Sequence, residues 1–227
     1  MSSDAPHDPG REEDFVRANT AIGHAPLVPE IALHLASEVT PLWHATEASM
    51  AKMQLPPPYW AFAWPGGQAL ARHLLDHPAL VAGKTVLDIG AGSGLTAIAA
   101  MKAGAARVTA AEIDVFAVAA IGLNAALNDV AIEVESADII GSANRNWDVI
   151  LVGDMCYERP LAERLLAWLA TLAARGAMVL MGDPGRAYLP PTGLAEIARY
   201  SVPTSLDLED RTIRETRILG FAGTGPG

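Results

Sequence analysis

The sequence has only one cysteine, Cys156, among its 227 residues. A single cysteine cannot form an internal disulfide or a cysteine-based zinc site, so we expect a reduced, partly buried thiol. No apolar run reaches the roughly 18 residues that a membrane-spanning helix needs. Lysines and arginines are not clustered, and the formal net charge is −10. These absences argue against nucleic acid and membranes as partners.

The first 20 residues are polar and acidic. They lack the basic start and apolar stretch of a secretory signal and the basic character of a mitochondrial presequence. We therefore expect a disordered tail over 1–20 and a cytoplasmic protein of bacterial type. The glycine-rich end, 222–227, predicts a second flexible tail. With 51% hydrophobic residues, the part between them (21–221) is expected to form a single domain.

Strands and helices alternate from Lys84 onward. Two long strands, 198–206 and 212–221, then follow without a helix between them. This order predicts an α/β, Rossmann-like fold, whose seven-stranded sheet is mostly parallel, ends in an antiparallel hairpin and carries helices on both faces. The earlier strands are predicted at 85–89, 107–111, 132–136, 147–152 and 177–181, and the helices at 95–103, 115–128 and 160–174.

An N-terminal extension of about 21–80 precedes this pattern and is predicted to be helical and aromatic. Apolar residues within 28–43 favour one short helix, and 68–75 favours an amphipathic helix. Between them, three prolines at 56–58 interrupt the chain before the aromatic segment 59–64.

A glycine-rich loop follows the strand at 85–89. Glycines let a ligand approach the backbone, and the first amides of the next helix favour an anionic group. A dinucleotide fingerprint would require a third glycine at position 95, where this chain has Leu95. Asp88 would repel a pyrophosphate, but it can order the loop and receive the ammonium group of S-adenosylmethionine, directly or through water. We therefore predict S-adenosylmethionine as the cofactor, bound by Asp88, Gly90, Ala91, Gly92 and Gly94.

Acidic residues also end the next two strands. Glu112 can accept both ribose hydroxyls as a bidentate acceptor, with Ile113 beside it, although NAD-binding proteins share this feature. Asp138 can accept from the adenine amino group while Ile139 packs on the ring, and a cap or loop acid is an equal alternative for Asp138. In the extension, Trp64 and Gln68 are predicted to contact the cofactor, although aromatic stripes often belong to the core.

Asp154 and Tyr157 leave the fourth strand where the methyl group should emerge. A lysine amine, with a pKa of about 10.4, must lose its proton before it can accept a methyl group. Asp154 is therefore a candidate to orient the amine, and Tyr157 to line its channel. The alternatives are a helix cap for Asp154 and core packing for Tyr157. His73 and His77 are spaced i, i+4 but lack a third ligand, so no metal site is predicted.

The segment from Pro58 to Leu70 (PYWAFAWPGGQAL) closely resembles the one that precedes the first core strand in lysine methyltransferases of the electron transfer flavoprotein β subunit. Stretches 86–94, 152–158 and 182–186 are similar to the same family, and the likeness spans 28–221. The resemblance implies a bacterial member of the seven-strand, class I S-adenosylmethionine-dependent methyltransferases. It also implies that lysine side chains of the flavoprotein β subunit accept the methyl group.

By this resemblance, Asp154 and Tyr157 occupy the motif tied to lysine methylation, and Glu112 occupies the place of the ribose-binding acid. Two residues depart from the family pattern. Cys156 stands where a larger aromatic residue is familiar, which puts the width of the substrate channel in doubt. Glu112 replaces a familiar aspartate, which lengthens its reach to the ribose.

Three other functions are weighed against this one. A methyltransferase of the same fold could act on a ribosomal protein or a small amine, but such enzymes often carry Asn-Pro-Pro-Tyr in place of residues 154–157. An NAD-dependent oxidoreductase is disfavoured by Leu95 and Asp88. A non-catalytic binding module has no reason to retain the acids and the tyrosine named above. The expected partner is therefore a protein substrate, and the chain is expected to be a monomer.

Overall fold

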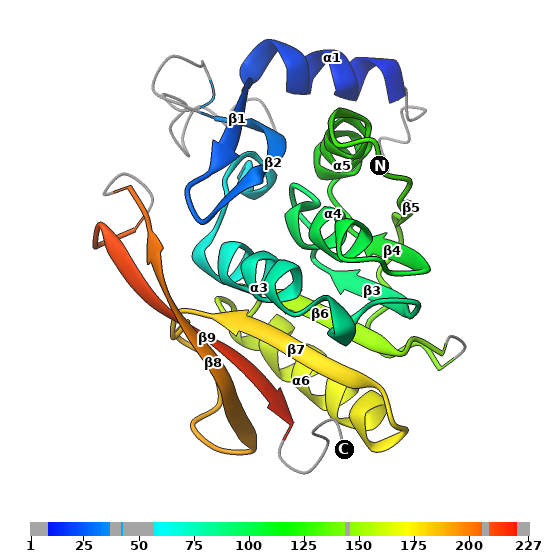
Figure 1. The fold of residues 1–227 in the computed structure, drawn as a ribbon, viewed down its shortest axis with the longest axis vertical. Helices are drawn as coiled ribbons and strands as arrows, with labels where there is room; N and C mark the ends of the chain where they lie inside the picture. The colour runs from blue at the N-terminus through cyan, green and yellow to red at the C-terminus, as the bar shows by residue number, and fades with distance from the viewer. Residues whose placement is uncertain (1–8, 37–41, 43–56, 144–145, 206–208, 222–227) are drawn as a thin grey trace, which may run out of the picture.

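A seven-stranded sheet forms the centre of the computed structural model, which describes residues 9–36, 42, 57–143, 146–205 and 209–221 (Figure 1). The strand order is β5-β4-β3-β6-β7-β9-β8. Neighbours from β5 to β7 pair in parallel, whereas β9 runs antiparallel to both β7 and β8. The predicted sheet and its closing hairpin are therefore confirmed. The strands are β3 (Thr85–Ile89), β4 (Arg107–Ala111), β5 (Glu133–Glu135), β6 (Val149–Gly153), β7 (Met178–Asp183), β8 (Leu194–Pro203) and β9 (Ile213–Phe221).

Helices cover both faces of this sheet, as predicted. Side chains of adjacent strand residues point to opposite faces, so Val149 packs in one hydrophobic cluster and Ile150 in another. The first cluster includes residues of α3 and α4, and the second includes residues of α6. The helices are α3 (Pro65–Asp76), α4 (Leu95–Lys102), α5 (Val115–Leu127) and α6 (Arg159–Ala174), with 3-10 turns η1 (Tyr59–Ala61) and η2 (Pro78–Leu80). No helix among the described residues is long and apolar enough to cross a membrane.

The disordered tail predicted for 1–20 is wrong over most of its length. Helix α1 (Pro9–Asn19) lies against α5, and Val16 is fully buried. Phe15 packs on Phe116 with ring centroids 4.6 Å apart. The acidic composition of this segment concealed these two apolar anchors. Residues 1–8 and the predicted tail at 222–227 lie outside the described residues.

The helix predicted within 28–43 is also wrong, because β1 (Ala21–Ala25) and β2 (Val28–Leu35) form an antiparallel pair there. Ile31 and Leu33 are fully buried at alternate positions, which is the period of a strand. The side chains of Asn124 on α5 and of Asn128, which caps its C-terminus, accept hydrogen bonds from backbone amides of β2 at 2.7 and 3.2 Å. This hairpin therefore docks on α5 through side-chain amides. The aromatic segment and α3 follow it in the extension.

Candidate active site

A cavity of about 560 Å³ opens where the parallel strands of the sheet end. Its walls come from the residues that follow β3, β4, β5, β6 and β7, together with the aromatic segment before α3. Ligands bind at this edge in open α/β sheets. Nine predicted site residues line it: Trp64, Gly90, Gly92, Glu112, Ile113, Asp138, Ile139, Asp154 and Tyr157. Four others, Gln68, Asp88, Ala91 and Gly94, are not among the lining residues.

Glu112 ties the glycine loop to the end of β4. Its Oε2 accepts from the Gly92 amide at 3.0 Å, and its Oε1 accepts from the amides of Ile113 and Asp114 at 2.8 and 3.2 Å. A carboxylate offers about four acceptor positions, so one remains on Oε2. The predicted bidentate contact with two ribose hydroxyls needs two. In this conformation Glu112 can therefore accept one hydroxyl while it holds the loop.

Glu112→Gln is expected to weaken S-adenosylmethionine binding by about 1–3 kcal/mol. The glutamine side chain is neutral, and its NH₂ group would face backbone N–H donors that now bind a carboxylate oxygen. This corresponds to a Kd roughly 5- to 150-fold higher. Isothermal titration with the cofactor alone measures it. Glu133→Gln, on β5 and outside the cavity lining, is the control and should bind as the unmodified chain does. Equal affinities in the two variants would contradict a cofactor role for Glu112.

Asp88 orders the loop from within the protein. It is 1% exposed, and its carboxylate accepts from the Thr96 hydroxyl of α4 at 2.8 Å. Burial raises the pKa of Asp88 to about 7, although the hydrogen bond from Thr96 opposes this shift. Since Asp88 does not line the cavity, the predicted direct contact with the cofactor ammonium is not available in this conformation. Its other predicted role, ordering the loop, agrees with the bond to α4.

Gln68, also predicted to contact the cofactor, makes its side-chain hydrogen bonds within the protein. It is 2% exposed, its Oε1 accepts from the Leu27 amide, and its Nε2 donates to the Ala63 carbonyl. It thus joins the β1–β2 turn to the aromatic segment, and it does not line the cavity. Asp138 does line that cavity, but its carboxylate pairs with Arg164 at 2.8 Å. An adenine amino group would share Asp138 with this arginine.

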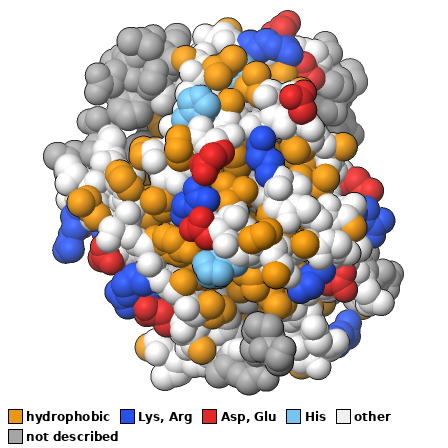
Figure 2. All heavy atoms as spheres, in the orientation of Figure 1, with side chains coloured by type: hydrophobic (Ala, Val, Ile, Leu, Met, Phe, Trp, Pro, Cys, Tyr) orange, Lys and Arg blue, Asp and Glu red, His pale blue; other side chains and the backbone are white. Residues whose placement is uncertain are grey.

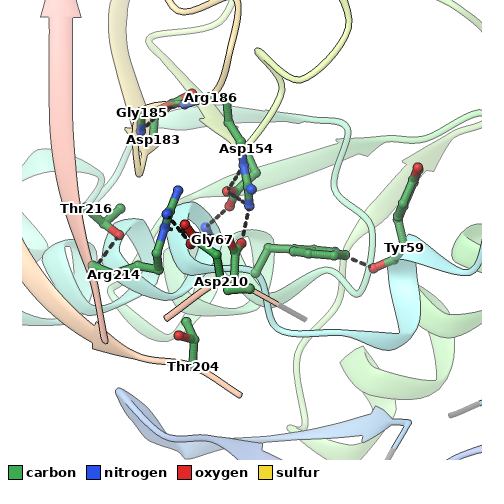
Figure 3. A network of polar contacts seen from close by, with 12 residues as sticks. Tyr59, Gly67, Asp154, Asp183, Gly185, Arg186, Thr204, Asp210, Arg214 and Thr216 are labelled. Atoms are coloured by element: carbon green, nitrogen blue, oxygen red, sulfur yellow. Dashed lines mark hydrogen bonds and ion pairs between the residues drawn. The ribbon is translucent and has the colours of Figure 1, made fainter. Parts of the chain in front are cut away.

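Asp154 lies at the inner end of the cavity and is 8% exposed. Its backbone is in the left-handed region with φ 57°, and its amide donates to the Gly182 carbonyl. Oδ1 accepts two hydrogen bonds from Arg186 at 3.0 and 2.7 Å, and Oδ2 accepts from the Gly67 amide at 3.1 Å (Figure 3). Burial raises the pKa of Asp154 to about 6, while the Arg186 cation opposes that rise. Asp154 is therefore mainly ionised at neutral pH.

Aromatic rings form the wall beside Asp154. Tyr59 contacts Trp64 and Tyr157 edge to face, with ring centroids 5.9 and 5.7 Å apart. The Trp64 indole N–H donates to the Tyr59 carbonyl at 2.8 Å, which fixes the indole orientation. Tyr59 and Tyr157 remain 49% and 44% exposed at the rim. A cavity that is lined by both a carboxylate and aromatic rings is a suitable environment for an alkyl amine.

The residues present fit S-adenosylmethionine. Gly90 and Gly92 would face it with backbone, Glu112 would accept from its ribose, and Ile113 and Ile139 would flank its base. The cavity volume falls within the range of small-ligand pockets. When bound, this cofactor supplies a sulfonium-activated methyl group. The aromatic wall and Asp154 lie in the same cavity, so a donor and an amine acceptor can meet there.

Sequence reasoning missed Arg186, which lines the cavity and pairs with Asp154. The segment 182–186 was noted only for its family resemblance, and no role was assigned to it. The available signal is an arginine three residues after the end of a strand. Its pairing with an acid 32 positions earlier depends on β6 and β7 being neighbours in the sheet.

Proteins of known family resemble this chain over most of its length. Electron transfer flavoprotein β subunit lysine methyltransferases are 42% identical in Danio rerio, over 93% of this chain and 85% of the relative, and 38% identical in Homo sapiens, over 91% and 80%. A family model, Ribosomal protein L11 methyltransferase (PrmA), matches residues 69–156. A solved structure from Pyrococcus horikoshii, provisionally described as an RNA methyltransferase, has a TM-score of 0.53 at 17% identity, covers 73% of this chain and 89% of its own, and supports the fold. As the resemblance predicted, the chain belongs to the electron transfer flavoprotein β-subunit lysine methyltransferases, a family of S-adenosylmethionine-dependent enzymes.

Proposed function

We propose that this chain transfers methyl groups from S-adenosylmethionine to lysine side chains of the electron transfer flavoprotein β subunit. The observation that carries the proposal is the buried Asp154, which lines the same cavity as the aromatic rings of Tyr59, Trp64 and Tyr157. The named activity of relatives with 36–42% identity supplies the substrate. Lysine is the acceptor that a carboxylate and aromatic faces suit, because they bind an alkyl amine without needing a planar partner.

The side chains of this site position the acceptor more than they react with it. Asp154 accepts a hydrogen bond from the amine and directs the nitrogen lone pair at the methyl carbon. With the cofactor bound, the N–C bond would form as the C–S bond breaks, and the proton released from the methylated nitrogen would pass to water at the cavity rim. Tyr59, Trp64 and Tyr157 would line the path of the lysine methylenes. Such positioning is the main contribution available to catalysis of an in-line transfer.

The surface is compatible with a basic protein partner. The net charge of −10 attracts lysine-rich surfaces at long range. On the face shown in Figure 2, acidic and basic side chains are interspersed, and the basic ones form no continuous patch. At the cavity rim, Ile113 is 69% exposed, and with Tyr59 and Tyr157 it offers apolar contact area.

The test is to incubate the purified chain with tritiated S-adenosylmethionine and a bacterial lysate, and to identify the labelled band by mass spectrometry. We expect the label on lysines of the electron transfer flavoprotein β subunit, and Asp154→Ala should give no labelled band. The match of residues 69–156 to the ribosomal protein L11 methyltransferase model makes a ribosomal protein the second candidate. A label on that protein would overturn the substrate assignment and leave the methyltransferase activity standing.

We also propose that the chain acts as a monomer in the bacterial cytoplasm. The sequence has one cysteine, Cys156, so it forms no internal disulfide, which suits a reducing compartment. This thiol is buried, and burial raises its pKa to about 12, which makes it unreactive.

A further inference from the structure

Arg186 joins the substrate-binding carboxylate to a second acid. Its Nη2 donates to Asp154 Oδ1 at 2.7 Å and also to Glu209 Oε1 at 2.7 Å (Figure 3). Its guanidinium carbon lies 5.6 Å from the centre of the Trp64 ring. The Arg186 side chain is 17% exposed and the Asp154 side chain 10%. The ion pair therefore lies largely out of water, where charge interactions are strong.

The loop that carries Arg186 is held firmly. The Oδ1 atom of Asp183 accepts from the amides of Gly185 and Arg186 at 2.6 and 2.7 Å. Asp183 is 1% exposed, so this turn is anchored in the protein interior. Three donors occupy Asp154, which leaves about one acceptor position for an incoming amine. An amine can therefore bind Asp154 while Arg186 remains in place.

An unpaired buried carboxylate would work against the transfer. A negative charge at hydrogen-bond distance stabilises an ammonium ion, and an ammonium has no lone pair to attack the methyl carbon. The same carboxylate is needed to orient the nitrogen. A fixed cation on the other side of the carboxylate reduces this conflict, because it offsets part of the negative charge and leaves an acceptor position available.

We propose that Arg186 is a positioning residue that neutralises Asp154, so that Asp154 orients the lysine amine without holding it in its protonated form. This inference rests on the proposed lysine methylation. It assigns a function to the 182–186 segment, whose role the sequence left open.

Other charged groups face this pair, and their balance is negative. Asp183 and Glu209 are buried acids beside Arg186, and Arg214 lies 3.6 Å from Glu209. Arg214 also pairs with Asp210, whose side chain is 66% exposed. Burial raises the pKa of the Cys156 thiol, and Asp183 and Asp154 add to this rise, so the thiol stays neutral. Glu112 faces the cavity from the end of β4, and Tyr157 lies three residues after Asp154 in the segment that follows β6. No described group besides Arg186 donates a cationic hydrogen bond to Asp154.

The first test is the pH dependence of kcat for the full chain with saturating flavoprotein substrate. The rate should fall at low pH as the pair formed by Asp154 and the amine takes up a proton. In Arg186→Gln this acid limb should move up by about 1 to 2 pH units, because a cation beside the pair has been removed. The rate at neutral pH then falls about tenfold or more, while the high-pH plateau stays within a few-fold. Arg186→Lys keeps the charge and should hold the acid limb near its original position.

The second test measures charge sensitivity without catalysis. Peptides around the methylated lysine carry either trimethyllysine, which is permanently cationic, or norleucine, which is neutral. The measured quantity is the ratio of the affinities for the trimethyllysine and norleucine peptides. This ratio should be about tenfold higher in Arg186→Gln than in the unmodified chain, because the Arg186 cation has been removed. Arg186→Lys should show the original ratio.

The outcomes separate a charge role from a structural one. A uniform loss of kcat at every pH in Arg186→Gln, with an unchanged peptide ratio, would overturn this inference while lysine methylation stands. If Arg186→Gln does not fold, Arg186→Lys provides the test. An acid limb of its kcat profile shifted upward by about 1 to 2 pH units would overturn the inference as well. A label on a nitrogen other than that of lysine would instead reject the proposed function itself.

Discussion

Asp154→Asn is expected to reduce methyl transfer by about 100- to 1,000-fold, the usual cost of losing one preorganised polar group at a reaction centre. The two carboxylate oxygens both face donors, because Oδ1 accepts from Arg186 and Oδ2 accepts from the Gly67 amide. In either orientation, an asparagine amide places its NH₂ group against an N–H donor. The variant therefore loses the charge and the fixed position that orient the amine.

Initial rates with radiolabelled S-adenosylmethionine measure this effect, and titration with the cofactor alone should give a Kd within a few-fold of the original. Asp148→Asn is the matched control. Asp148 precedes β6, at the opposite end from Asp154, and accepts from Thr85 away from the cavity. This variant should keep normal turnover. Near-normal turnover in Asp154→Asn would remove Asp154 from the mechanism.

The sequence could predict the sheet because its information there is local. Short apolar runs ending in glycine or an acid predict parallel strands, and the carboxyl ends of parallel strands meet at one edge. Gly90, Glu112 and Asp154 could therefore be assigned to one site without knowledge of any contact between them. The cavity lining confirms that they lie together.

Two kinds of feature could not be predicted in this way. Bonds between distant segments, such as Arg186 with Asp154, depend on which strands are neighbours and on how a loop folds back. The direction of a buried polar side chain is also not encoded by its position. Asp88 and Gln68 belong to motifs that adjoin the cavity, yet the side chains of both form hydrogen bonds with other parts of the protein.

In the N-terminal part, amino-acid composition is a poor guide to structure. The acidic run before residue 20 suggested disorder, but the apolar pair Phe15 and Val16 is enough to dock α1 on α5. In the segment after it, Ile31 and Leu33 are two positions apart, which is the spacing of buried residues in a strand. This spacing predicts the observed structure better than the number of apolar residues, which suggests a helix.

Gly66→Ala is expected to destabilise the protein by about 3 kcal/mol, the upper part of the range for overpacked cores. A methyl group at Gly66 would collide with the Gly182 carbonyl oxygen and with Asp154 Oδ2. Gly182 lies within β7, paired with β6 and β9, so its backbone has little freedom to move away. The start of α3 approaches this strand closely because neither Gly66 nor Gly182 carries a side chain.

The adjacent Gly67→Ala is the matched control, because a methyl group there meets no atom within 4 Å. We expect it to change stability by less than about 1 kcal/mol, in the stabilising direction, since alanine restricts the unfolded chain. Urea unfolding of both variants measures the difference, and equal midpoints would contradict the close packing at Gly66. The collision also displaces Asp154, which Gly67 holds through its amide. Gly66→Ala should therefore lose more activity than its unfolded fraction accounts for, because the contact that fits α3 to the sheet also positions the carboxylate.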